Sequence, residues 1–119
     1  MNRETPLNYV RTKRRHWALT QKELAYLIGI EGRTGITRIE QGERLPTIEI
    51  ALALEVLFGT PPRTMFPHFY AETEETLMQR ALLLHERLIQ GTSPTEKRKC
   101  ELLEQALARA TQSDNTQHV

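Results

Sequence analysis

Apolar residues recur along the chain at intervals of three and four positions, which is the spacing of one face of an α-helix. Runs in which apolar and polar residues alternate, as they do in strands, are absent from the sequence. We therefore predict an all-α fold. It comprises a five-helix domain at residues 1–69, an αα-hairpin at residues 70–112 and a disordered polar tail at residues 113–119.

Capping residues predict where the first two helices begin and end. The Thr5-Pro6 pair opens a first helix that runs to about Trp17, because proline fits the first helical turn. Thr20 and Glu23 have the spacing of a capping box, and the helix that they open ends at Gly29. The residues expected to face inward from this second helix are Leu24, Ala25, Leu27 and Ile28.

Two further helices follow the same rules. The third contains Ile36 and Ile39, one turn apart, and ends at Gly42. The fourth begins after Thr47 and ends at Gly59. Its expected apolar face is formed by Ile48, Ala51, Leu52 and Leu57.

A short fifth helix at residues 60–66 ends at Pro67, and the pattern then becomes that of two long helices. Gly91 ends the first of them, and a second capping box at Ser93 and Glu96 opens the other. The apolar seam of the first long helix is Leu77, Ala81, Leu84 and Leu88. The seam of the second is Cys100, Leu103, Leu107 and Ala110. Two such helices joined by a tight turn form an antiparallel αα-hairpin.

The composition is that of a globular protein, with 39% hydrophobic and 26% charged residues among 119. No apolar run approaches the roughly 18 residues that span a bilayer, and the amino-terminal stretch lacks the apolar core of a signal peptide. Cys100 is the only cysteine, which excludes an internal disulfide and fits a reducing compartment. We expect a cytoplasmic protein in which Cys100 is a small buried hydrophobic residue.

Charge is spread unevenly, although the net charge is only +1. Residues 1–69 contain ten Lys and Arg against seven Asp and Glu, whereas residues 70–119 contain six against eight. The basic excess gathers in the segment at residues 11–17, "RTKRRHW". This distribution suggests a first domain that faces an anionic partner and a second part with another task.

The histidines offer no metal site by their spacing. His16, His68, His85 and His118 are scattered, and no two of them stand at ligand spacing with a carboxylate or cysteine between them. His85 is expected on a helix surface. The sequence also shows no nucleophile with a base, no carboxylate pair and no cofactor loop. We therefore expect no metal, no cofactor and no catalytic residues.

Gly29, Gly32 and Gly35 raise the question of a phosphate-binding loop. A loop of that kind has a second glycine five positions after the first, then lysine, and follows a strand. Here Thr34 occupies the second glycine position, no lysine follows any of the glycines, and a capped helix precedes them. The stretch is better explained as the tight turn of two short helices, an arrangement whose second helix can enter the major groove of DNA.

The outward face of the second of these helices is polar. If Ile36 and Ile39 face the core, the residues on the opposite side are Thr34, Thr37, Arg38 and Gln41, with Arg33 at the edge. Such side chains can hydrogen-bond base edges or phosphates. An ordinary solvated helix face would show the same composition.

Residues 19–59 resemble the phage-repressor (XRE-type, Cro-like) helix-turn-helix family, and the resemblance extends over about residues 7–66. The motifs that carry it are Leu19-Thr20-Gln21, Glu23-Leu24-Ala25, the Gly29 turn, Ile36-Thr37-Arg38-Ile39-Glu40, Gly42, Pro46 and the "ALALEVLFG" helix. The resemblance implies a five-helix repressor-type domain that binds double-stranded DNA. The DNA-binding residues that it and the polar face together suggest are Gln21, Arg33, Thr34, Gly35, Thr37, Arg38, Gln41 and Arg44.

The resemblance also implies a structural pair between Arg14 in the first helix and Glu40 in the third. We interpret this pair as a clamp between helices and not as a DNA contact. Arg44 falls in the loop where members of the family touch phosphates. Arg11, Lys13 and Arg15 are further candidates for phosphate contacts, or they only solvate their helix.

Three features depart from the family pattern. The chain is one residue longer between Gly29 and Ile36, and Gly35 stands where many members carry a base-reading side chain. We predict that the longer turn starts the third helix later and lets backbone approach DNA closely. The alternative is a loosened turn with no recognition role. Lys13 occupies a position that is usually apolar, which leaves the register of the first helix open by one residue.

The hairpin is a candidate dimerisation element, because operators are usually read by two domains related by a two-fold axis. The dimerisation candidates are Leu77, Leu84, Leu88, Leu103 and Leu107, with surplus apolar surface at Leu82, Leu83, Ile89, Leu102 and Ala106. Alternatively, the hairpin packs on its own head as additional core.

The sequence thus favours a sequence-specific regulator of transcription that binds double-stranded DNA as a homodimeric repressor. Such a protein would act on the nucleoid of a prokaryote or on the DNA of a phage or mobile element. Two alternatives stay open. One is an antitoxin whose carboxy-terminal helices bind a protein partner, and the other is a protein-interaction module that has lost DNA binding.

Overall fold

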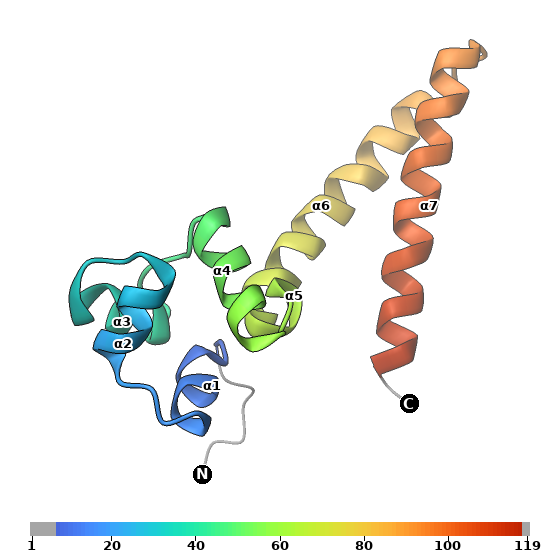
Figure 1. Ribbon diagram of the computed structural model, residues 1–119. Helices are drawn as coiled ribbons and strands as arrows, with labels where there is room; N and C mark the ends of the chain where they lie inside the picture. The colour runs from blue at the N-terminus through green and yellow to red at the C-terminus, as the bar shows by residue number, and fades with distance from the viewer. Residues whose placement is uncertain (1–6, 118–119) are drawn as a thin grey trace. The chain divides into compact units, whose positions relative to one another are not determined.

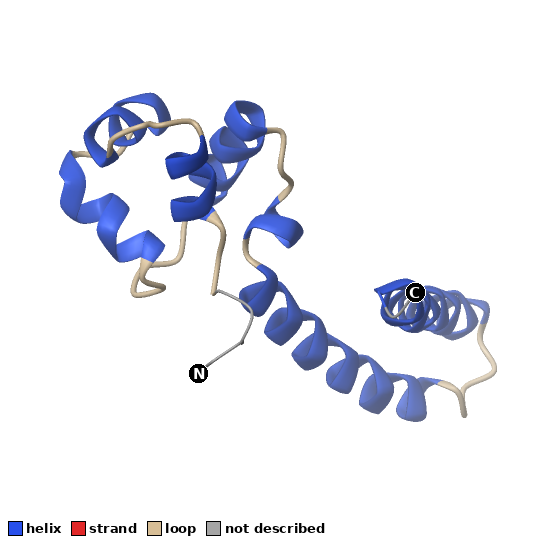
Figure 2. Cartoon of the chain, turned by 90° about the horizontal axis from the view of Figure 1, so that it is seen from below, coloured by secondary structure: helices blue, strands red, loops and turns tan. Residues whose placement is uncertain are grey.

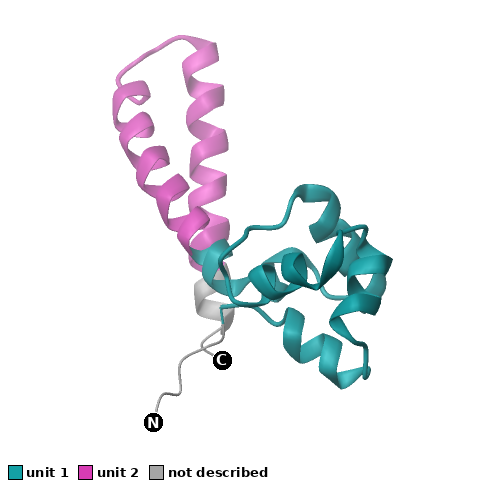
Figure 3. Ribbon diagram, turned by 90° about the vertical axis from the view of Figure 1, so that its left-hand side faces the viewer, with its two compact units in different colours: residues 1–71 teal, residues 72–119 magenta. Residues whose placement is uncertain are grey.

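The computed structural model describes residues 7–117, with side chains through residue 112, and its regular elements are helices (Figures 1 and 2). They are α1 (Val10–His16), α2 (Gln21–Ile28), α3 (Gly32–Glu40), α4 (Ile48–Phe58), α5 (Pro62–Met65), α6 (Pro67–Leu88) and α7 (Pro94–Gln117). The predicted all-α fold, a helical domain followed by carboxy-terminal helices, is confirmed. Residues 1–71 and 72–119 form two compact units (Figure 3), which are described in turn.

Helix α1 begins later than the sequence predicts. The expected start at Thr5-Pro6 lies outside the described residues, and residues 7–9 are not helical. The Asn8 side chain explains the later start, because its Oδ1 accepts a hydrogen bond from the Val10 amide at 3.1 Å. Its Nδ2 donates to the Ile39 carbonyl at 2.9 Å, which ties this segment to the end of α3.

Helix α2 has the predicted caps, and a turn with two left-handed glycines follows it. The Thr20 and Glu23 capping box is present, and Gly29 adopts the left-handed conformation with φ of +80°. Gly32 is also left-handed, with φ of +75°. Because glycine adopts positive φ without strain, Gly29 and Gly32 let the chain reverse between the two helices, and α3 begins at Gly32. That the longer turn delays the third helix relative to other members of the family stays a prediction.

Buried apolar side chains from α1 to α5 and the residue after α5 form one core in the first unit. The core residues are Val10, Leu24, Ala25, Ile28, Ile36, Ile39, Ile50, Leu54, Met65 and Phe66. Leu27 was expected in this core, but it is half exposed. Met65 also accepts a backbone hydrogen bond from the Tyr9 amide at 2.9 Å, so α5 holds the segment that leads into α1.

Helix α4 buries a different face from the one that we predicted. Ile50 and Leu54 are in the core, whereas Ile48, Leu52 and Leu57 are exposed. The reason is that nine of its eleven residues are apolar, so the sequence pattern singles out no face. Packing against the other helices makes that choice.

The second unit contains α6 from residue 72 onward and α7, which form an antiparallel hairpin (Figure 3). Pro67 begins α6 and does not merely end α5. The predicted capping box of α7 is present, because the Glu96 amide donates to Ser93 Oγ at 3.1 Å and the Ser93 amide donates to Glu96 Oε1 at 3.2 Å. Helix α7 continues to Gln117, past the predicted boundary at residue 112, since no glycine or proline interrupts it. Residues 118–119 of the predicted tail lie outside the described residues.

The hairpin has little core of its own. Within the described part of this unit, Ala81 and Cys100 are the buried apolar residues, at 6% and 8% exposure. Leu88, Leu103, Leu107 and Ala110 are partly buried, and Leu77 and Leu84 are exposed. His85, which we expected on a helix surface, is partly exposed, and its Nε2 lies 2.8 Å from Glu104 Oε2 across the hairpin.

Candidate nucleic-acid interface

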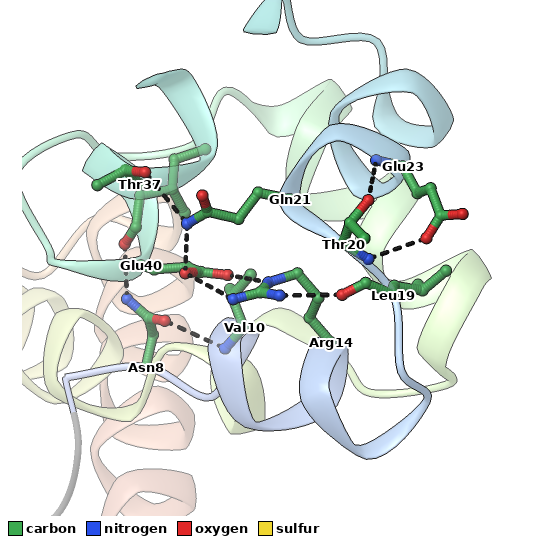
Figure 4. Close-up of polar contacts among 10 residues, drawn as sticks. Asn8, Val10, Arg14, Leu19, Thr20, Gln21, Glu23, Thr37 and Glu40 are labelled. Atoms are coloured by element: carbon green, nitrogen blue, oxygen red, sulfur yellow. Dashed lines mark hydrogen bonds and ion pairs between the residues drawn. The ribbon is translucent and has the colours of Figure 1, made fainter. Parts of the chain in front are cut away.

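Arg14 and Glu40 join helices α1 and α3 (Figure 4). Arg14 Nε lies 2.6 Å from Glu40 Oε2, and the two side chains are only 11% and 5% exposed. Arg14 Nη2 donates to Glu40 Oε1 at 3.4 Å, and Nη1 donates to the Leu19 carbonyl at 2.9 Å. The guanidinium therefore connects α1, α3 and the linker that leads into α2. This burial also shows that the register of α1 places Arg14, and not Lys13, against α3.

Gln21, the first residue of α2, is held against α3. Its Nε2 donates to Thr37 Oγ1 at 3.1 Å and to Glu40 Oε1 at 3.2 Å (Figure 4). A side-chain amide has two N–H donors and one carbonyl acceptor. Because both donors of Gln21 are engaged, the carbonyl oxygen is the group that it has for another molecule.

An open hollow of about 490 Å³ lies over this hydrogen-bond network. Its lining comes from α1, α2 with its cap, α3 and the residue after α3: Arg11, Arg14, Arg15, Thr20, Gln21, Arg33, Thr37, Glu40 and Gln41. Four arginines against one glutamate make this lining cationic. Since Arg14 neutralises Glu40, the charge of the other three arginines is available to an anion.

The structure brings only some of the sequence-predicted residues into this hollow. Gln21, Arg33, Thr37 and Gln41 line it, together with Arg11 and Arg15, which were secondary candidates. Thr34 and Arg38 are exposed on α3 outside it. The polar face predicted for the third helix therefore exists, with Ile36 and Ile39 buried on the other side.

Gly35 lies on a packed side of α3 and is buried. A Cβ atom at this position would stand 2.5 Å from Ile30 Cγ2 and 3.2 Å from Arg44 Nη1. The glycine thus lets the Ile30 side chain and the Arg44 guanidinium approach the helix. This packing explains why the position is occupied by glycine. The predicted close approach of its backbone to DNA stays a prediction.

A comparison with protein families agrees with the arrangement of α2, the Gly29 turn and α3. The helix-turn-helix family model matches residues 10–64. The first unit is an XRE-type helix-turn-helix domain. No curated protein and no solved structure matches the chain. In this helix-turn-helix domain, α2 and α3 are the two helices of the motif, and the match supports a DNA-binding regulator of the XRE type.

Two residues of the helix-turn-helix domain were missed as parts of the site. Asn8 bonds the segment before α1 to the end of α3. The sequence held a signal for part of this role, because asparagine is common just before a helix. Thr20 was predicted only as a cap, yet it also lines the hollow. Among the described residues, no cluster of three potential metal ligands occurs. None of the described helices is long and apolar enough to cross a bilayer.

Proposed function

We propose that the chain is a sequence-specific regulator that binds double-stranded DNA and represses transcription as a homodimer. It would act in the cytoplasm, on the nucleoid of a prokaryote or on the DNA of a phage or mobile element. The observation that carries this proposal is the tethered Gln21 amide at the edge of an arginine-lined hollow, beside the polar face of α3. Both the charge and the hydrogen-bonding groups of this surface suit a DNA groove flanked by phosphates.

The chemistry of the side chains suggests which of them would contact base edges. Arg33 and Arg38 present guanidinium groups, which pair with guanine in two hydrogen bonds. Thr34, on α3, and Gln41, just after it, add further polar groups that can hydrogen-bond. The Gln21 carbonyl accepts from an exocyclic amine, as adenine and cytosine offer in the major groove.

The remaining predicted contacts belong to the DNA backbone. Arg44, in the loop after α3, and Arg11 and Arg15, on α1, would neutralise phosphates. Thr37 serves mainly to orient Gln21, because its hydroxyl accepts from the Gln21 amide.

The exposed apolar surface of the hairpin supports the dimer. Large side chains that are more than half exposed on it include Leu77, Leu82, Leu83, Ile89 and Leu102. A hairpin whose described part has two buried apolar residues and this much exposed leucine and isoleucine would gain stability by burying that surface against another copy. In this proposal, the exposed Leu84 and the part-buried Leu88, Leu103 and Leu107 complete the apolar layer.

Selection of bound fragments from random and genomic DNA, with moderate salt and excess competitor, tests the function. We expect enrichment of an inverted repeat whose half-sites lie about 34 Å apart, one helical turn. The Arg33→Ala/Arg38→Ala double variant should lose the enrichment. The matched control is Arg63→Ala, which removes an exposed arginine on α5 away from the hollow. Failure of the unmodified chain to enrich any sequence would refute sequence-specific binding.

The same hairpin surface favours a second candidate, an antitoxin whose carboxy-terminal helices bind a protein partner. Sedimentation of the purified chain separates the two. A dimer at micromolar concentration supports the homodimeric repressor, whereas a monomer with exposed leucines supports the antitoxin. A module that has lost DNA binding would show weak nucleic-acid binding with almost no dependence on salt.

A further inference from the structure

The hairpin of α6 and α7 (magenta in Figure 3) carries apolar and cationic side chains together on one of its faces, which we call the basic face. The apolar residues of the basic face are Leu77, Leu84, Leu102 and Ala106, and its cations are Arg80, Arg87, Lys99 and Arg109. We propose that the basic face is the docking site for an acidic amphipathic helix of a partner protein.

The burial pattern of the hairpin shows which side chains share this face. Ala81 on α6 is buried and Leu103 on α7 is partly buried, so each points towards the other helix. Each residue advances by about 100° around a helix, so residues four before and three after these two lie on one flank, and residues one before and six after lie farther out on it. These residues are Leu77, Arg80, Leu84 and Arg87 on α6, and Lys99, Leu102, Ala106 and Arg109 on α7. His85 and Glu104 lie on the opposite flanks, and their 2.8 Å contact shows that corresponding flanks of the two helices meet on the same face.

The side chains of the basic face are open to another molecule. Leu77, Leu84 and Leu102 are 56%, 37% and 61% exposed, and the four cations are exposed as well. Within the part of the chain that the structure describes, neither ion pair involves any of these cations. An open hollow of about 320 Å³ beside Leu77 and Arg80 leaves room for a docking side chain.

The carboxylates of the hairpin lie mainly away from the basic face. At about 100° per residue, Glu75, Glu86 and Glu104 fall on the opposite flanks of their helices. Glu72 and Glu101 fall on the outer sides, and Glu72 also lines the hollow. Because four cations outnumber these two carboxylates at its edges, the basic face attracts an anionic partner.

The form of the hairpin favours a helix as the occupant. Its described part buries two apolar residues, Ala81 and Cys100, so the leucines of the basic face belong to no core. A third helix can pack against two antiparallel helices at once, and its apolar stripe would cover these leucines. From Leu77 to Arg87 the basic face runs for about 15 Å, so about three turns of a partner helix fit along it.

The cations determine the charge of that helix. A second copy that used the same face would set arginines against arginines, and this repulsion disfavours pairing of the face with itself. The phosphates of DNA would satisfy the cations, but contacts to phosphate and sugar would leave the leucines in water. An amphipathic helix with carboxylates along both edges of its apolar stripe satisfies the leucines and the cations together.

This inference goes beyond the proposed function, because it depends on the hairpin and not on DNA binding. It assigns the leucines of the basic face to the partner helix. Leu82, Leu83 and Ile89 are exposed outside the basic face and stay available to the second copy of the proposed dimer.

Fluorescence anisotropy of a labelled peptide, titrated with the full chain, tests the docking site. The probe is a helical peptide of about 18 residues, about 27 Å long, with a stripe of leucines flanked by glutamates. Its counterpart has lysine in place of every glutamate. We expect the acidic peptide to bind at least about tenfold more tightly than its counterpart, with an affinity that falls as salt is added.

Substitutions in the chain locate the binding. Arg80→Ala/Lys99→Ala removes one cation from each helix of the basic face and should weaken binding of the acidic peptide about tenfold. The matched control, Arg63→Ala/Lys97→Ala, removes the same charges from exposed positions on α5 and on the opposite flank of α7, and should leave binding unchanged. Leu102→Ala should also weaken binding, because it removes apolar contact without changing the charge. Circular dichroism checks that each variant keeps its helices.

Equal affinity for the two peptides, no binding of the acidic peptide, or equal losses in the two double variants would overturn the proposal. Unchanged binding in Leu102→Ala would also overturn it, because charge attraction alone would then account for the binding. If a DNA duplex or phosphatidylserine vesicles bind through Arg80 and Lys99 while the acidic peptide does not, the basic face serves another partner and the proposal fails. Binding of the acidic peptide by a chain that enriches no DNA sequence would leave the docking site standing while the proposed function fails.

Discussion

The Arg14 guanidinium pairs with the Glu40 carboxylate, with Nε 2.6 Å from Oε2, and this contact joins the first helix of the domain to the end of the third. Glu40 also accepts a hydrogen bond from Gln21 at 3.2 Å. One buried carboxylate therefore orients both the helix clamp and the amide at the start of α2. Stability of the domain and the geometry of its candidate interface depend on the same residue.

Replacing Glu40 by alanine should lower the free energy of unfolding by about 3 kcal/mol, because it leaves the Arg14 charge buried without a partner. Urea denaturation without DNA measures this loss. Glu43→Ala is the control, since Glu43 is exposed in the following turn and its replacement should change stability by less than about 0.5 kcal/mol. Similar losses in the two variants would show that the Arg14–Glu40 pair stabilises the domain no more than an exposed glutamate does.

Gly35→Ala should destabilise the domain although alanine favours helix. The gain in helix propensity is about 1 kcal/mol, but the new methyl would stand 2.5 Å from Ile30 Cγ2. That methyl moves little because Ile30 is branched at Cβ. Overpacking costs about 1–3 kcal/mol, so we expect a net loss of about 1 kcal/mol by thermal or urea unfolding. The double-mutant cycle with Ile30→Ala decides the cause, because additive effects of the two substitutions would contradict a clash between these residues.

Loss of the α2 cap is a third measurable change. Thr20 Oγ1 accepts from the Glu23 amide at 3.0 Å, and Glu23 Oε1 accepts from the Thr20 amide at 2.9 Å. Thr20→Ala should therefore cost about 1 kcal/mol of stability. Thr12→Ala, at an exposed position inside α1, is the matched control and should be close to neutral or slightly stabilising. The prediction does not survive if both variants unfold at the same urea concentration.

The salt dependence of DNA binding should report the arginines of the hollow. If Arg15 neutralises one phosphate, Arg15→Ala makes the slope of log affinity against log salt shallower by about 0.9. Titrations at several salt concentrations measure this slope. Arg63→Ala should leave it unchanged, because Arg63 is on α5 and does not line the hollow. An unchanged slope in Arg15→Ala would show that Arg15 neutralises no phosphate.

Local signals in the sequence predicted the limits of several helices correctly. The Thr20 and Glu23 box, the Gly29 cap and the Ser93 and Glu96 box all occur as predicted. Each of these depends on hydrogen bonds or backbone angles within a few residues, so neighbouring residues suffice to specify them. The polar face of α3 followed in the same way from the burial of Ile36 and Ile39.

The tertiary structure alone decided what depends on residues distant in sequence. It chose Ile50 and Leu54 as the buried side of α4, since an almost wholly apolar helix gives no preference of its own. It started α1 at Val10 through an asparagine that also bonds to the end of α3. It also explained Gly35, whose missing side chain makes room for Ile30 and Arg44. By itself, the sequence determined the helices, their caps and the family of the domain. Packing determined which side of each helix is left for another molecule, because burial is a property of the assembled chain and not of any one segment.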